Sequence, residues 1–192
     1  MVAIGTEIES PQTGERIIFR STEESSNGEV FRAELIMQPG PYVVRTHIHP
    51  VQEERFVVLE GKFGYRIGDR EGVAEAGETL VCPVGVPHSQ HNAGDGAMRI
   101  YYEHRPALTS AEIFFETYFG LSRDGKLSEK GDMKLLQAAV LLQEVGDFIR
   151  PASPPLWMQD ALFAPLAALS RLRGYRARYP EYALPQAEPP SA

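Results

Sequence analysis

The sequence predicts a mainly β fold, a barrel or sandwich of antiparallel strands, followed by a C-terminal α-helical extension. From Ile17 to about Tyr102, short runs of β-branched and aromatic residues alternate with turn residues. After Pro106, apolar residues recur at spacings of three and four residues, as in helices. The length of 192 residues suits one principal domain with a sizeable core. We therefore expect a barrel domain over residues 1–106 and a helical extension over residues 107–192, which packs on the barrel or on a partner subunit.

The strands of the barrel are predicted from runs that are short, apolar on one face and bounded by turn signals. In chain order these runs read RIIFR, EVFRAELIM, YVVRTHIH, RFVVLEG, KFGYRIG, ETLVCPVG and AMRIYYEH, with turns such as QPGP and DREG between them. Short strands at this spacing are typical of an antiparallel barrel or sandwich.

Two helices are predicted next. Thr109 and Glu112 stand at capping-box spacing before the run AEIFFETYF, so we expect a helix of roughly three turns that begins there. A second helix is expected to begin after Ser128 and to carry MKLLQAAVLLQEVGDFI, which is rich in good helix formers.

A third helix is predicted from LWMQDALFAPLAALSRLRGY. Pro165 lies inside this run and is expected to kink or split the helix, and Gly174 is well placed to end it. The tail from Pro180 to Ala192 is rich in proline, and we expect it to fray or to lie along the surface.

The composition excludes several classes of protein. Hydrophobic residues make up 43% and charged residues 23% of the chain, values that are ordinary for a globular protein. The net charge of -7 disfavours binding to nucleic acid. Cys82 is the single cysteine, the first residues show no secretory signal and no run approaches the roughly 18 apolar residues of a membrane span. We therefore expect a cytoplasmic protein without a membrane span.

Three histidines and a glutamate form the most informative pattern. Side chains alternate along a strand, so His47 and His49 project to one side and can share one ion. Glu54 begins the next strand, and if that strand returns antiparallel to the first, a single hairpin supplies all three of these ligands. His88 follows a Pro-x-Gly turn and would enter from a separate strand.

These residues resemble the two sequence motifs of the cupin superfamily. The first motif is matched by His47, His49, Glu54 and Gly61, and the second by Gly77, Pro83, Gly85, His88 and Asn92. The resemblance covers about residues 30 to 105. It implies a double-stranded β-helix, or jelly roll, in which His47, His49, Glu54 and His88 are the metal ligands.

The ligand set implies one divalent transition metal ion. Three imidazoles and one carboxylate suit Fe, Mn, Ni or Co with two positions open on an octahedral ion, and Zn is a further candidate. Our leading hypothesis is a metal-dependent enzyme that acts on a small organic substrate. By family analogy a dioxygenase-like reaction comes first, followed by an isomerase or a decarboxylase. The alternative is a non-catalytic barrel that binds or senses a small molecule.

Strand alternation also predicts which side chains face the pocket. Arg45, Phe56, Val58 and Gln90 share the parity of the metal ligands and are candidate substrate-pocket residues. Tyr65 and Tyr101 are weaker candidates, because large strand aromatics more often belong to the core.

Other titratable residues have a simpler interpretation. Glu53 is expected to be a solvated charge, since only one of two adjacent glutamates can face inward. His91 and His104 have no motif support and are expected to be structural or exposed. Cys82 ends an apolar strand and is expected to be a buried, inert thiol.

The apolar helix faces require a partner. We expect the faces from Ile113 to Phe119 and from Leu135 to Val145 to pack on the outside of the barrel or to form a homodimer interface, and we favour a homodimer.

Overall fold

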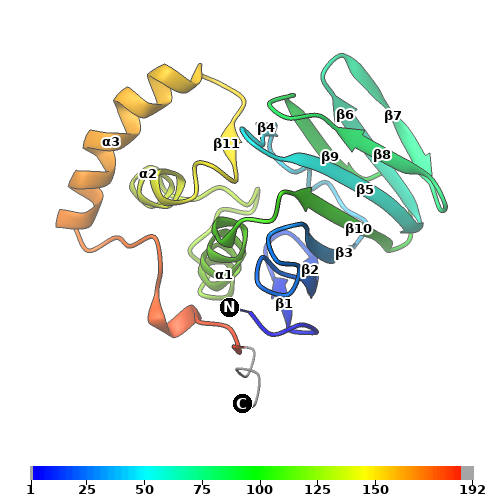
Figure 1. The fold of residues 1–192 in the computed structure, drawn as a ribbon, viewed down its shortest axis with the longest axis horizontal. Helices are drawn as coiled ribbons and strands as arrows, with labels where there is room; N and C mark the ends of the chain where they lie inside the picture. The colour runs from blue at the N-terminus through cyan, green and yellow to red at the C-terminus, as the bar shows by residue number, and fades with distance from the viewer. Residues whose placement is uncertain (1, 187–192) are drawn as a thin grey trace.

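The fold consists of two antiparallel sheets with helices at one end (Figure 1). The computed structural model describes residues 2–186. The first sheet contains, in spatial order, β1 (Glu7–Ser10), β2 (Glu15–Ser21), β3 (Phe31–Met37), β10 (Met98–Arg105), β5 (Glu53–Glu60) and β8 (Thr79–Cys82). The second contains β11 (Arg150–Pro151), β4 (His47–Ile48), β9 (His88–Asn92), β6 (Lys62–Ile67) and β7 (Arg70–Glu75). The predicted fold class, mainly β with a helical extension, is confirmed.

The core lies between the sheets because the strands alternate buried and exposed residues. On β5 the buried side chains are those of Glu54, Phe56 and Val58, with exposed or partly exposed neighbours. The largest fully buried side chains include Phe19, Phe31, Phe56, Phe63 and Met37. Period-two alternation thus brings apolar residues and the predicted metal ligands to the same interior.

The helices cover one end of the barrel. They are α1 (Thr109–Arg123), α2 (Leu135–Glu144) and α3 (Leu156–Leu172), followed by a short 3₁₀ helix, η1 (Pro180–Tyr182). In Figure 1, α1 lies against β1 and β2, while α3 is outermost. Phe115 of α1 stacks on Phe31 of β3 with ring centroids 5.7 Å apart, so one hydrophobic core contains both barrel and helix residues. None of the helices in the described residues is long and apolar enough to cross a membrane.

The predicted capping box at the start of α1 is wrong. Within the described residues, no side chain caps this helix, whose N-cap residue is Leu108. Glu112 instead accepts a hydrogen bond from the backbone N–H of Val2 at 2.9 Å, and the hydroxyl of Thr109 donates to Glu23. Tertiary partners from the N-terminal part of the chain have replaced the local cap.

The second helix is shorter than predicted. It begins at Leu135 and ends at Glu144, whereas residues 128–134 contain a turn at 129–130 and otherwise no regular secondary structure. Ser128 Oγ accepts the backbone N–H of Asp132 at 3.0 Å, and the backbone N–H of Ser128 donates to the carbonyl of Asp132 at 2.9 Å. These local hydrogen bonds compete with helix formation, as serine side chains commonly do.

The third helix runs unbroken through Pro165. Pro165 and Ala161, whose carbonyl loses its intrahelical partner, are both exposed, so water can satisfy the freed group. Gly174 ends the helix as predicted: its φ is +83°, and the following N–H, of Tyr175, donates to the carbonyl of Ser170 at 3.0 Å.

The described part of the C-terminal tail, residues 180–186, lies along the surface, the second of the two expected outcomes, and two buried side chains anchor it there. Tyr182 is 3% exposed and Leu184 is 7% exposed. A Cβ added at Gly120 of α1 would lie 2.2 Å from the Tyr182 ring, so the missing side chain makes room for this contact. An isolated β-bridge joins Val2 to Gln186, and the rest of the predicted tail, residues 187–192, lies outside the described residues.

Candidate metal centre

The four predicted ligands come from both sheets, and the predicted hairpin is wrong. His47 on β4 is directly paired with His88 on β9 in the second sheet. Glu54 lies on β5 in the first sheet, where its strand pairs with β8 and β10. His49 follows β4 immediately, and its carbonyl accepts the N–H of Gly85 in the turn before His88, at 2.9 Å. The carboxylate therefore meets the imidazoles across the barrel interior.

The side chains converge on one buried point. One ligand atom from each of His47, His49, Glu54 and His88 can be chosen so that all lie within 4.8 Å of one another. The Nε2 atoms of His88 and His49 lie 2.7 Å and 3.4 Å from Oε2 of Glu54. All four residues are buried. This grouping could hold a metal ion.

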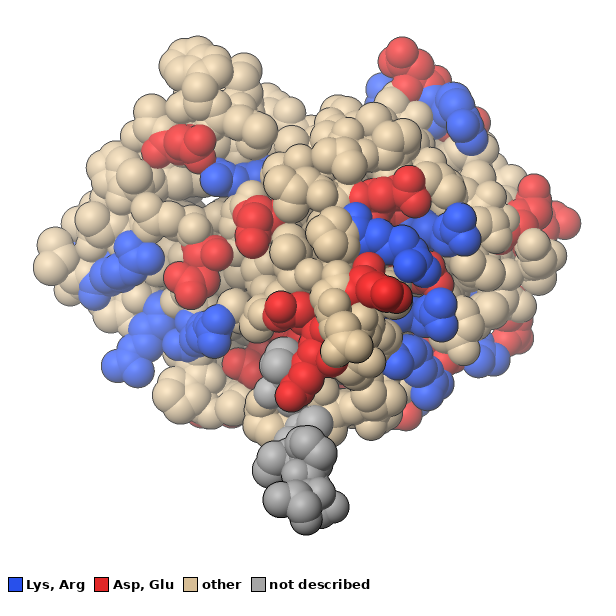
Figure 2. Space-filling model, in the orientation of Figure 1, with Lys and Arg blue, Asp and Glu red and all other residues tan. Residues whose placement is uncertain are grey.

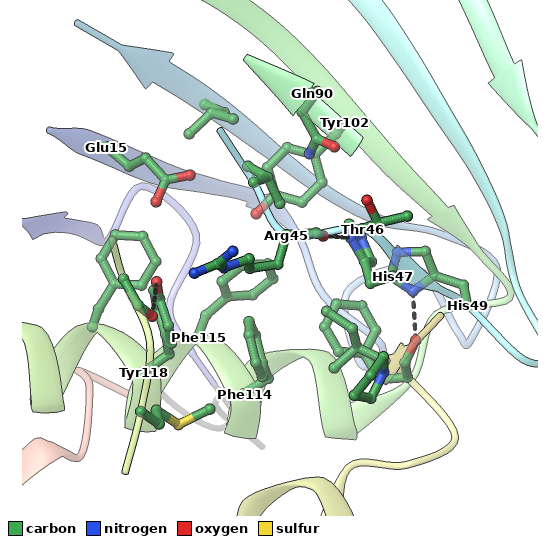
Figure 3. Close-up of a pocket in the computed structure, with 18 of the residues that line it drawn as sticks. Glu15, Arg45, Thr46, His47, His49, Gln90, Tyr102, Phe114, Phe115 and Tyr118 are labelled. Atoms are coloured by element: carbon green, nitrogen blue, oxygen red, sulfur yellow. Dashed lines mark hydrogen bonds between the residues drawn. The ribbon is translucent and has the colours of Figure 1, made fainter. Parts of the chain in front are cut away.

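Backbone carbonyls orient the three imidazoles. The Nδ1 atoms of His47, His49 and His88 lie 2.8, 2.5 and 2.9 Å from the carbonyl oxygens of Arg45, Phe148 and Val86, to which they can donate a proton. Figure 3 shows the hydrogen bond of His49. With Nδ1 engaged, each Nε2 is left with its lone pair for a ligand.

Two buried atoms of the cluster lack hydrogen-bond partners. Among the described residues, Nε2 of His88 and Oε2 of Glu54 have none, although they lie close together. Buried polar atoms are rarely unpaired. Three nitrogen donors and one carboxylate also form a ligand set that first-row transition metals accept. The residues present therefore fit a divalent metal ion.

A cavity of about 310 Å³ opens onto this cluster. His47, His49 and Glu54 form part of its wall, and α1 contributes an aromatic wall with Phe114, Phe115 and Tyr118 (Figure 3). Its volume is at the lower end of the range of about 300–1,000 Å³ for small-molecule sites.

Only some of the candidate pocket residues line the cavity. Arg45 and Gln90 line the cavity. Phe56 is in the core instead, with its ring centroid 4.8 Å from that of Phe63 and 6.3 Å from that of His88. Val58 is also a core residue. Tyr65 and Tyr101 are not among the lining residues, and Tyr101 packs under the guanidinium of Arg32 on the outer face of the barrel.

The sequence profile of the family described as Cupin domain matches residues 33–102. The chain contains a cupin domain. The predicted resemblance is thus confirmed, and the matched segment carries all four clustered residues.

Solved cupin-fold structures are similar to the chain at low identity. KdgF from Halomonas sp. is 13% identical, with a TM-score of 0.48 and coverage of 55% of this chain and 93% of the other. A predicted oxalate decarboxylase from Thermotoga maritima is 19% identical, with a TM-score of 0.48 and coverage of 56% and 100%. An RmlC-like cupin from Shewanella frigidimarina is 21% identical, with a TM-score of 0.46 and coverage of 55% and 90%. No curated protein sequence matches the chain.

The electrostatics of the protein groups in the cupin centre favour a protonated His88 beside an ionised Glu54. Burial lowers the pKa of His47 well below its usual value, helped by His88 and His49. Although burial opposes ionisation of Glu54, the surrounding imidazoles of His49, His104 and His88 hold the pKa of this carboxyl well below its usual value. Burial also opposes the charge on His88, but the adjacent carboxylate raises the pKa of His88 to about 10. A bound cation would replace that proton as the partner of Glu54.

His104 is the residue of this cupin centre that sequence reasoning missed. It is directly paired with Glu54 on β10, is 1% exposed and points its Nε2 at Oε1 of Glu54, 3.3 Å away. The same nitrogen lies 3.3 Å from Nε2 of His49. The available signal was alternation along AMRIYYEH, which gives His104 the same parity as the core residues Ile100 and Tyr102.

Proposed function

We propose that this cupin domain is a metal-dependent enzyme that acts on a small organic substrate, with a dioxygenase-like reaction as the first class to test. The observation that carries the proposal is the position of the buried cluster in the wall of a cavity of about 310 Å³. A purely structural metal would need no adjoining space. Isomerase and decarboxylase reactions come next, because the same ligand set serves them.

His47, His49, His88 and Glu54 would hold one Fe, Mn, Ni, Co or Zn ion. Such an ion supplies Lewis acidity and, for the redox-active metals, electron transfer with dioxygen. The chain's own residues provide the rest: backbone carbonyls fix the imidazole tautomers, and Phe114, Phe115 and Phe148 give the cavity an apolar wall that reduces its content of water.

The metal site is tested by metal analysis of tag-free protein. We expect close to one equivalent of a transition metal in the wild type and a loss of metal in His47→Ala and His88→Ala. His91→Ala is the matched control, since His91 lies on the same strand as His88, on its opposite face, and is outside the cluster. Absence of metal in the wild type, even after reconstitution with each of the five ions, would refute the proposal.

A measurement of substrate turnover distinguishes an enzyme from a non-catalytic binding module. For an enzyme, oxygen uptake or product formation depends on a substrate and collapses in the two variants that lose metal. Saturable binding without any product would instead identify a non-catalytic small-molecule sensor, the alternative function.

A further inference from the structure

The cavity has two chemically different ends. One end is the metal cluster, and the other contains Glu15 of β2, whose carboxylate accepts a hydrogen bond from the hydroxyl of Thr13 at 2.7 Å and another from Tyr42. Glu15 is 7% exposed. Aromatic side chains of α1 line the space between the ends (Figure 3).

Two unpaired polar side chains lie along this space. Tyr102 is 5% exposed and Gln90 is 7% exposed. Neither the hydroxyl of Tyr102 nor Oε1 of Gln90 has a hydrogen-bond partner among the described residues, although both residues line the cavity. In Figure 3, Tyr102 lies between Glu15 and the histidines. Unpaired buried polar atoms are costly, so their presence here points to a ligand that completes their hydrogen bonds.

Once Glu15 is ionised, its charge disfavours an anionic group at this end of the cavity. The cations that line the described cavity are outside its buried part: Arg45 is paired with Asp132 at 2.7 Å with a side chain 66% exposed, and Lys130 is exposed. A carboxylate beside Glu15 would thus have a like charge for a neighbour and no buried cation to neutralise it.

We propose that the cavity binds a small aromatic molecule with an oxygen substituent at the metal end and no anionic group at the far end. Tyr102 and Gln90 act as hydrogen-bonding recognition residues, and Glu15 acts as the specificity-determining residue that rejects anions. This inference rests on the proposed function, because the oxygen end is defined by the metal cluster.

The test compares two catechols that differ only at the far end. The probes are 4-ethylcatechol and 3,4-dihydroxyphenylacetate, and binding to the Zn(II)-reconstituted full chain is measured by anaerobic calorimetry at pH 8, where Glu15 is largely ionised. We expect 4-ethylcatechol to bind at least about tenfold more tightly, an effect in keeping with one unpaired like charge in a buried site. Equal affinities, or a preference for the acid, would overturn the proposal.

Single-residue variants test which side chains cause the difference in affinity between the two probes. In Glu15→Gln the ratio of affinities is expected to fall to about threefold or less, because the amide keeps the shape of the side chain without its charge. Tyr102→Phe is expected to weaken binding of both probes by about fivefold to tenfold, the range for loss of one hydrogen bond. Tyr101→Phe is the control on the opposite face of the same strand and should bind as the wild type does. Identical behaviour of the two tyrosine variants would contradict the role given to Tyr102.

Failure of this inference is distinguishable from failure of the proposed function. Zinc content is measured on the same samples, and the two probes are also titrated into metal-free protein. Retained zinc without a preference between the probes overturns the inference alone. A preference for 4-ethylcatechol in a protein that retains no metal supports the role of Glu15 alone and refutes both the metalloenzyme and the oxygen end placed at the metal.

Discussion

At the scale of single residues, His104 positions the one carboxylate of the metal centre. Oε2 of Glu54 faces His88, and Oε1 lies 3.3 Å from Nε2 of His104. Burial and the neighbouring His49 lower the pKa of His104 to about 4, so its imidazole is neutral and can donate one N–H. We interpret His104 as the donor that holds Glu54 with its other oxygen free for the ion, since partners of this kind commonly orient metal ligands.

Replacing His104 should therefore weaken metal binding without removing a ligand. We expect His104→Phe to lower the affinity for Zn(II) by about tenfold to a hundredfold, the usual effect of losing such a partner. His104→Gln, whose amide can still donate a hydrogen bond to Glu54, should lower the affinity for Zn(II) by less. Competition with a chromophoric chelator measures both affinities. Equal affinities for wild type and His104→Phe would show that Glu54 needs no such support.

Glu15 gives stability a pH dependence that can be isolated. Burial raises the pKa of this carboxyl from 4.5 to about 7, so the folded state binds the proton more tightly than the unfolded chain. Stability is then lost between pH 4.5 and 7 as the pH rises, by at most about 3 kcal/mol. We expect Glu15→Gln to raise the melting temperature at pH 8 and to leave it unchanged at pH 4. Glu9→Gln, at an exposed position on β1, is the control, and an equal effect at both pH values would contradict the argument.

At the scale of elements, an ion cluster ties three strands of the first sheet together. Glu34 of β3 is 2% exposed and is held by Arg20 of β2 and Arg99 of β10, each through two N–H groups at 2.5 to 3.1 Å. Burial opposes its ionisation, yet these hydrogen bonds and charges keep the pKa of Glu34 below its usual value. The cluster thus stabilises the sheet while Glu34 is ionised.

The removal of this charge should destabilise the protein most at neutral pH. We expect Glu34→Gln to lower the free energy of unfolding by about 1–3 kcal/mol at pH 7, the range for hydrogen bonds to charged groups. Because the folded pKa is depressed, the stabilisation is complete above the unfolded value of 4.5 and is lost as the pH falls through the folded value. Urea titrations at pH 7 and pH 3 measure the difference. Glu60→Gln is the control, since Glu60 is exposed and lies 3.5 Å from Arg99; a similar loss there would argue against the cluster.

The elements also show what a sequence can and cannot predict. Alternation and motif spacing correctly predicted that His47, His49, Glu54 and His88 face the barrel interior. This was possible because the alternation of side chains along a strand depends only on that strand's own residues. Which strands pair was not predictable in this way: β5 joins β10, which begins 38 residues after β5 ends, rather than β4. His104 was missed for the same reason, since its importance comes from being paired with Glu54. The capping of α1 was wrongly predicted, although the helix begins at Thr109 as expected, because a cap depends on distant partners such as Val2.

At the scale of the whole molecule, the predicted homodimer requires a surface other than the one first considered. The faces from Ile113 to Phe119 and from Leu135 to Val145 are largely covered within the chain, with Leu141 and Val145 fully buried. Large exposed apolar side chains are instead found on α3, namely Leu156, Trp157, Leu162, Leu169 and Leu172. The α3 part of the molecule carries few charged side chains at the upper left of Figure 2, whereas acidic and basic residues are mixed over the barrel.

The homodimer stays a prediction, and sedimentation equilibrium tests it. If two copies associate through α3, Trp157→Glu combined with Leu172→Glu should convert a dimer into a monomer and leave metal content unchanged, because both side chains are exposed and neither belongs to the buried cluster. A matched change on the barrel, Val73→Glu on exposed β7, should keep the wild-type mass. A wild-type protein that sediments as a monomer would refute the predicted homodimer.

The helical extension contacts the barrel next to His49, one of the candidate metal ligands. Phe148, just after α2, accepts the hydrogen bond of His49, and β11 pairs with β4 through Arg150 opposite Ile48. The N–H of Ala152 also donates to the carbonyl of Thr46 at 3.3 Å. The extension thus supplies part of the support of the centre, and an ion that fixes His49 should also restrain the segment that holds it.

Hydrogen exchange with and without Zn(II) measures this coupling. We expect metal to slow amide exchange in residues 146–152 as well as in residues 45–50, because opening of β11 would release the imidazole that the ion requires. The edge strand β7 is the internal control, since it pairs with β6 rather than with a ligand-bearing strand and, in the described residues, contributes no ligand to the cluster. Unchanged exchange in residues 146–152 beside clear protection at residues 45–50 would mean that the barrel binds metal without help from the extension. Protection of both segments would instead make the ion a link between the two halves of the chain, so that metal loss loosens the cavity wall that α1 and Phe148 provide.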